Sequence, residues 1–96
     1  MRRQLEKIRE LIGTGMPDEA IRQADILLTD NEGLHEDDKS RLLYLKGLAH
    51  MKYSDWKKAL DCFMQSQELD AEGPAVEARQ MLTDIMNFYN KDMFNQ

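Results

Sequence analysis

Apolar residues recur along this chain at intervals of three and four, which is the spacing of one face of an α-helix. In residues 2–12 that face consists of Leu5, Ile8, Leu11 and Ile12. Gly13 and Gly15 follow, and glycine can take the left-handed conformation that ends a helix without steric cost. A second helix is predicted to begin at Pro17, where the missing N–H costs no hydrogen bond, and to end near Thr29.

The same pattern appears again in the second half of the chain. A third helix is expected from Glu36, and a fourth begins after Ser54 or Asp55, either of which could cap its N-terminus. A fifth helix follows the glycine–proline pair at 73–74 and continues into the C-terminal stretch. Five helices with short connections and no strand signal predict an all-α antiparallel stack.

Two segments of the chain repeat each other. Residues 15–20 align with residues 54–59, so that each residue lies 39 positions before its counterpart. This offset equals a helical repeat of about 34 residues plus an insertion of about five, which we place around 34–38. A single domain, residues 1–96, is therefore expected to contain a first repeat at 1–34, a second repeat at 40–73, and a closing helix with a tail at 74–96.

The second helix pair resembles the tetratricopeptide repeat family. Gly47 stands where that family has a small residue that lets the partner helix approach, and Ala59 matches the small residue facing the same crossing. Trp56 and Phe63 match the large residues that lie between repeats. In the first repeat Ile8 replaces the small residue, which predicts a looser crossing. The departures in the second repeat are Lys46, His50 and Ala71, where the family usually has Leu, Tyr and Pro.

This resemblance implies an α-α superhelix of two helical hairpins with a C-terminal capping helix. It also implies a non-catalytic scaffold or adaptor that binds a peptide or a helix on a concave face lined by the first helix of each pair. The residues that the resemblance and helical spacing place on this predicted concave face are Leu5, Arg9, Ile12, Arg41, Tyr44, Leu45, Leu48, Met51, Arg79, Leu82 and Met86. Any of them could instead be core, because so small a domain has little apolar surface to spare.

The C-terminal stretch is unusually apolar for an exposed tail. Phe88, Tyr89, Met93 and Phe94 lie within it, and a contiguous apolar patch is usually buried or functional. These residues could extend the closing helix as core, fold back onto the concave face, or pair with a second copy of the chain. The last possibility gives the alternative function, a self-assembling structural module that forms a homodimer through the closing helix and tail.

Composition narrows the choice of partner. The chain has 13 basic and 18 acidic residues and a net charge of −5, which is the wrong sign for a phosphate backbone or an anionic membrane. No apolar run approaches the roughly 18–20 residues of a membrane span. A single cysteine suits a reducing compartment. We therefore expect a cytoplasmic protein whose partner is a protein or peptide, and neither nucleic acid nor membrane.

Catalysis, a cofactor and a metal site are not expected. His50 occupies a position that the resembling family fills with a packing tyrosine, and Cys62 lies next to Phe63, where a buried thiol is usually inert. The acidic run at 30–38 lacks the residue order of a calcium loop. These residues are better explained as a helix contact, a core thiol and a solvated loop.

Overall fold

The computed structural model describes the backbone of residues 1–30 and 33–94, and the side chains of those residues as far as Phe88. Within this part of the chain the secondary structure is entirely helical, with no strand. The helices are α1 (Arg2–Gly13), α2 (Pro17–Asp30), α3 (Glu36–Lys52), α4 (Trp56–Leu69) and α5 (Ala75–Phe94). The predicted all-α fold is confirmed.

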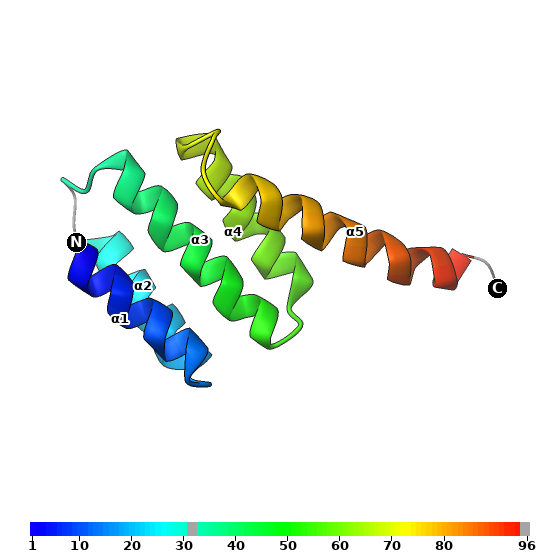
Figure 1. Ribbon diagram of the computed structural model, residues 1–96, viewed down its shortest axis with the longest axis horizontal. Helices are drawn as coiled ribbons and strands as arrows, with labels where there is room; N and C mark the ends of the chain where they lie inside the picture. Colours follow the sequence, from blue (N-terminus) through cyan, green and yellow to red (C-terminus); the bar gives the residue numbers. More distant parts are fainter. Residues whose placement is uncertain (31–32, 95–96) are drawn as a thin grey trace.

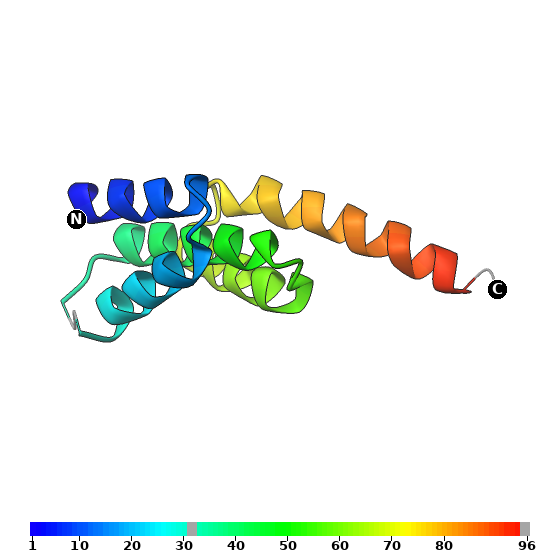
Figure 2. The ribbon, with the colours of Figure 1, turned by 90° about the horizontal axis from the view of Figure 1, so that it is seen from below.

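The helices form two antiparallel hairpins, α1/α2 and α3/α4, followed by α5 (Figure 1). Helix α3 is central and packs against α1, α2 and α4, whereas α5 packs mainly on α4. Viewed from the side, α1 and α5 lie on one side of the molecule and α2 and α4 on the other (Figure 2). The C-terminal half of α5 extends beyond the two hairpins in both views.

The turns of the two hairpins share two backbone hydrogen bonds, 39 positions apart. In the first turn, the Gly15 N–H donates to the Ile12 carbonyl (3.3 Å) and the Met16 N–H donates to the Leu11 carbonyl (2.8 Å). In the second turn, the Ser54 N–H donates to the Met51 carbonyl (3.0 Å) and the Asp55 N–H donates to the His50 carbonyl (3.1 Å). Gly15 and Ser54 both have positive φ, +81° and +57°. The aligned segments are therefore repeats in geometry as well as in sequence.

Asp55 is the residue that caps α4. Its Oδ1 accepts a hydrogen bond of 3.3 Å from the Lys58 N–H. Of the two residues that the sequence offered as the cap, Ser54 instead takes the left-handed position of the turn.

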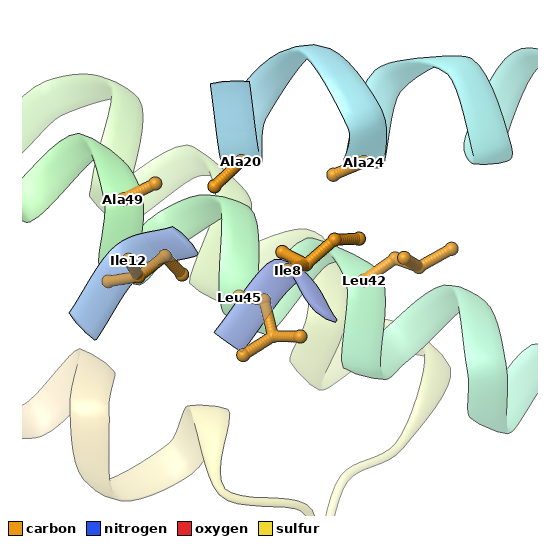
Figure 3. Close-up of a cluster of buried hydrophobic side chains, with 7 residues drawn as sticks. All are labelled: Ile8, Ile12, Ala20, Ala24, Leu42, Leu45 and Ala49. Atoms are coloured by element: carbon orange, nitrogen blue, oxygen red, sulfur yellow. The ribbon is translucent and has the colours of Figure 1, made fainter. Parts of the chain in front are cut away.

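The core consists of two clusters of buried side chains. The first joins the two hairpins and contains Ile8, Ile12, Ala20, Ala24, Leu42, Leu45 and Ala49 (Figure 3). The second lies between α4 and α5 and contains Ala59, Phe63, Ala75, Ala78 and Leu82. Tyr44 and Leu48 of α3 pack against both clusters and so connect them.

Helices α3 and α4 approach each other closely at Gly47. A Cβ atom built on Gly47 would lie 2.5 Å from Cε1 of Phe63, a side chain with no solvent exposure. Only glycine fits this position without displacing the ring, as the sequence predicted. Helix α1 packs less extensively on α2 than α3 does on α4, but α1 is also shorter than α3, so the looser crossing of the first hairpin stays a prediction.

A buried pair of serines fastens the open end of the second hairpin. Ser40 and Ser66 are 2% and 1% exposed. The Ser66 hydroxyl lies 2.7 Å from the Ser40 carbonyl, and the Ser40 hydroxyl lies 2.9 Å from the Ser66 carbonyl. Reciprocal bonds from each hydroxyl to the opposite backbone satisfy both buried groups. Nothing in the hydrophobic pattern of the sequence marks Ser40 and Ser66 as a pair.

Candidate protein-binding surfaces

The predicted concave face is largely part of the core. Ile12, Leu45 and Leu82 are 7%, 1% and 0% exposed, so they present almost no surface to a partner. Their assignment as binding residues is corrected to core, because Ile12 and Leu45 belong to the cluster that joins the two hairpins and Leu82 belongs to the cluster between α4 and α5. Five further apolar residues are partly buried and pack against the two clusters: Leu5, Tyr44, Leu48, Met51 and Met86.

The predicted arginines lie nearer to solvent. Arg9 and Arg41 are exposed, and the Arg41 guanidinium is 3.8 Å from the Asp38 carboxylate. Arg79 is partly buried and donates a hydrogen bond of 2.9 Å from Nη1 to Oε1 of Gln67 on α4. The accessible part of the predicted concave face is therefore mainly cationic.

Helix α5 carries a second apolar stripe that faces solvent. Ala78 and Leu82 point into the second cluster, whereas Met81 and Phe88 are 49% and 65% exposed. Ile85, which lies between these two, is partly buried. Positions 81, 85 and 88 lie about a quarter of a helical turn away from 78 and 82. The apolar arc of α5 is thus wider than one contact can cover.

This exposed stripe has one acidic edge. Together with the apolar residues, Glu77, Gln80 and Asp84 line a shallow hollow along the helix, and all three are exposed. Gln80 Nε2 donates a hydrogen bond of 3.1 Å to Asp84 Oδ1, which leaves the second carboxylate oxygen available to a partner. We call the set Glu77, Gln80, Met81, Asp84, Ile85 and Phe88 the outer face of α5.

The sequence contained a signal for the outer face, but periodicity alone did not identify it. Of the three possibilities left open for the C-terminal stretch, the structure excludes extension of the core for Phe88, since this side chain is largely exposed. The helix continues away from the hairpins to Phe94 and does not fold back onto α1 and α3 (Figure 1). The side chains of Tyr89, Met93 and Phe94 lie outside the described residues.

A smaller exposed apolar pair lies where the two hairpin turns meet. Met16 and Tyr53 are 52% and 51% exposed. The Tyr53 hydroxyl bonds to the Asp18 carboxylate, and this bond raises the pKa of Tyr53 above its ordinary value. The contact connects the second turn to the start of α2, so Tyr53 has a structural role.

The environments of His50 and Cys62 both favour the uncharged form of the side chain. Burial and the nearby Lys46 ammonium lower the pKa of His50, so its imidazole is uncharged at neutral pH. Burial raises the pKa of the Cys62 thiol, which makes it a poor nucleophile. Among the residues that the structure describes, no three His, Cys, Asp or Glu side chains come together as metal ligands.

One departure from the tetratricopeptide pattern has a local explanation. Lys46 Nζ lies 2.7 Å from Asp25 Oδ1, so a lysine at this position pairs the second hairpin with α2 of the first.

In the described part of the chain, none of the helices has the length and apolar content that crossing a membrane requires.

Comparisons with known proteins give one close relative. No protein-family model matches the chain, and no curated protein matches it. The solution NMR structure of Bacteroides fragilis protein BF1650 is similar, with 42% sequence identity, a TM-score of 0.80, and coverage of 97% of this chain and 90% of that chain. Identity at this level over nearly the whole of both chains means common descent as well as a common fold. The chain therefore belongs to the same protein family as BF1650 of Bacteroides fragilis.

Proposed function

We propose that this chain is a non-catalytic protein-interaction module that binds a peptide or helix of another protein, in the role of a scaffold or adaptor. The observation that carries the proposal is the outer face of α5, where Met81 and Phe88 are about half exposed or more on a helix already packed by its other side. Exposed apolar surface with a polar border is typical of interaction sites.

Other features support the same reading. The repeated turns and the close Gly47–Phe63 crossing favour assignment of the hairpins to the tetratricopeptide family, whose members bind proteins. The raised pKa of the buried Cys62 thiol disfavours nucleophilic catalysis at this residue. A free and buried thiol at Cys62 favours a reducing compartment such as the cytoplasm.

A self-assembling homodimer is the second candidate. It is favoured by the same exposed stripe and by the extension of α5 beyond the hairpins, which leaves the helix accessible to a second copy (Figures 1 and 2). Light scattering over a range of protein concentrations separates the two, because the interaction module stays monomeric and the homodimer does not.

Selection of peptides from a display library on the full-length chain tests the interaction module. We expect enriched sequences with a shared pattern, whose binding is lost with Met81→Glu. Met64→Glu is the matched control, because Met64 is also exposed on a helix, at 37%. Arg9→Glu with Arg41→Glu tests the accessible part of the predicted concave face in the same assay.

The outcomes distinguish the site from the function. Loss of binding only with the double arginine variant would keep the function and move the site to the predicted concave face. A library that yields no enriched sequence on the folded chain would contradict the function itself.

A further inference from the structure

Resting on the proposed function, we propose that the outer face of α5 receives a basic amphipathic helix. Apolar residues of this helix cover Met81, Ile85 and Phe88, and its lysines or arginines lie beside Glu77 and Asp84. The inference names the chemistry of the partner, which the proposed function leaves open.

The shape of the outer face suits a helix. Met81, Ile85 and Phe88 are spaced i, i+4 and i+7, so they form a straight row about 10 Å long on two turns of α5. A second helix presents anchors at the same spacing and can place them along such a row. Because α5 extends beyond the hairpins, a partner helix meets no other helix of the described chain at the C-terminal end of the row (Figure 2).

The charges of the outer face select a basic partner. Glu77 and Asp84 are both exposed, and Gln80 is the remaining polar residue of the hollow. No lysine or arginine is among the described residues that line it. The chain as a whole carries a net charge of −5. Basic residues along the edge of a docked helix that faces Glu77 and Asp84 would gain local attraction, and the overall field would accelerate association.

The same charges disfavour a second copy as the occupant. Pairing two outer faces brings the carboxylates of Glu77 and Asp84 on one chain close to those of the other, and like charges repel at an interface. Met81 and Phe88 contribute most of the exposed apolar surface of this face, and so few large side chains suit a weak contact better than a permanent dimer. A helix of another protein needs less area for a weaker and reversible contact.

A pair of synthetic helical peptides tests this inference on the full-length chain. Both have leucines at i, i+4 and i+7, and they differ only in flanking residues, which are lysine and arginine in one and glutamine in the other. We expect the basic peptide to bind about tenfold more tightly in fluorescence anisotropy at low salt. The gap should close at high salt, because screening weakens exposed charge pairs.

Matched variants assign the effect to the two carboxylates. Glu77→Gln with Asp84→Asn should abolish the preference for the basic peptide and leave binding of the glutamine peptide unchanged. Glu6→Gln with Glu10→Gln removes two exposed carboxylates from α1 and should retain the preference. Circular dichroism of each variant checks that the helices remain intact.

Three results would overturn the inference. Equal binding of the two peptides would mean that the face recognises apolar surface alone, and failure of both peptides while display ligands still bind would place the site elsewhere. Either result leaves the proposed function standing. A concentration-dependent dimer that Met81→Glu dissociates would assign the face to a second copy.

Discussion

Each hairpin has a large and a small residue facing each other at its buried crossing. In the first hairpin the large residue is on the first helix, and in the second hairpin it is on the second helix. In α1/α2 the large residue is Ile8 on the first helix and the small one is Ala24 on the second, both without exposure (Figure 3). The residues 39 positions later are Gly47 and Phe63, so that in α3/α4 the small residue is on the first helix. Both arrangements fill the space between the helices.

This exchange shows that packing at the crossing limits the combined volume of the two facing side chains, and does not fix the residue type at either position. Interiors are close-packed, so a larger side chain is tolerated where its neighbour is smaller. Judged by the tetratricopeptide pattern alone, Ile8 is a departure that weakens the first repeat. With Ala24 considered as well, it is half of a compensated pair.

The largest expected effect comes from breaking this compensation in the second hairpin. Gly47→Ile should destabilise the fold by about 3 kcal/mol, because the new side chain meets the buried Phe63 ring. Adding Phe63→Ala copies the arrangement of the first hairpin and should recover about 1 kcal/mol or more of that loss. Urea denaturation measures both. A double variant no more stable than Gly47→Ile alone would refute the volume argument.

A second prediction concerns the serine pair, which also distinguishes the hairpins. The positions equivalent to Ser40 and Ser66 are Met1 and Leu27, both of which pack against the first cluster. Ser66→Ala should cost about 1 kcal/mol, since one reciprocal hydrogen bond is lost inside the protein. Ser40→Ala combined with Ser66→Ala should cost less than the sum of the single changes, which a double-mutant cycle in denaturant determines. Strict additivity would mean that the two hydroxyls act independently.

Substitutions in the two hairpin turns should change stability by smaller amounts and in opposite directions. Ser54 and Gly15 occupy equivalent positions with positive φ, a conformation that disfavours residues other than glycine. Ser54→Gly should therefore stabilise the second hairpin by about 0.5–1 kcal/mol, and Gly15→Ala should destabilise the first by a similar amount. Thermal unfolding midpoints should move in opposite directions. A decrease for both variants would show that the Ser54 side chain contributes a contact that outweighs its backbone strain.

The smallest effect depends on pH and is confined to the first hairpin. Hydrogen bonds from Arg22 and Gln23 lower the pKa of Glu19 from 4.5 to about 2. Because its pKa is lower in the folded state, its contribution is complete above pH 4.5 and is lost as the pH falls towards 2. The equivalent residue of the second hairpin is Lys58. Glu19→Gln should flatten the stability profile in this range, slightly, since the group is exposed; an unchanged profile would refute the assignment.

The helix boundaries were predictable because local chemistry sets them. Pro17 at a first turn, Asp55 at a cap and Gly15 in a left-handed turn each act within a few residues of chain. Ser40 and Ser66 were not predictable, because a small polar residue in a helix usually indicates a solvated position. Their burial depends on each other, 26 residues apart.

The candidate site was harder to predict than the fold, for a related reason. Periodicity identifies apolar faces but does not tell which face a neighbouring helix covers. On α3 nearly every apolar residue is at least partly buried, so Leu45 is core. On α5 two adjacent stripes are apolar, and only packing in three dimensions decides that Leu82 is buried while Met81 is exposed.

Chemical-shift mapping by NMR, with the basic helical peptide titrated into the labelled full-length chain, tests the central claim most directly. We predict that the perturbations centre on Met81, Asp84, Ile85 and Phe88 of the outer face. Perturbations that centre instead on Arg9, Arg41 and Tyr44, with α5 unchanged, would contradict the account.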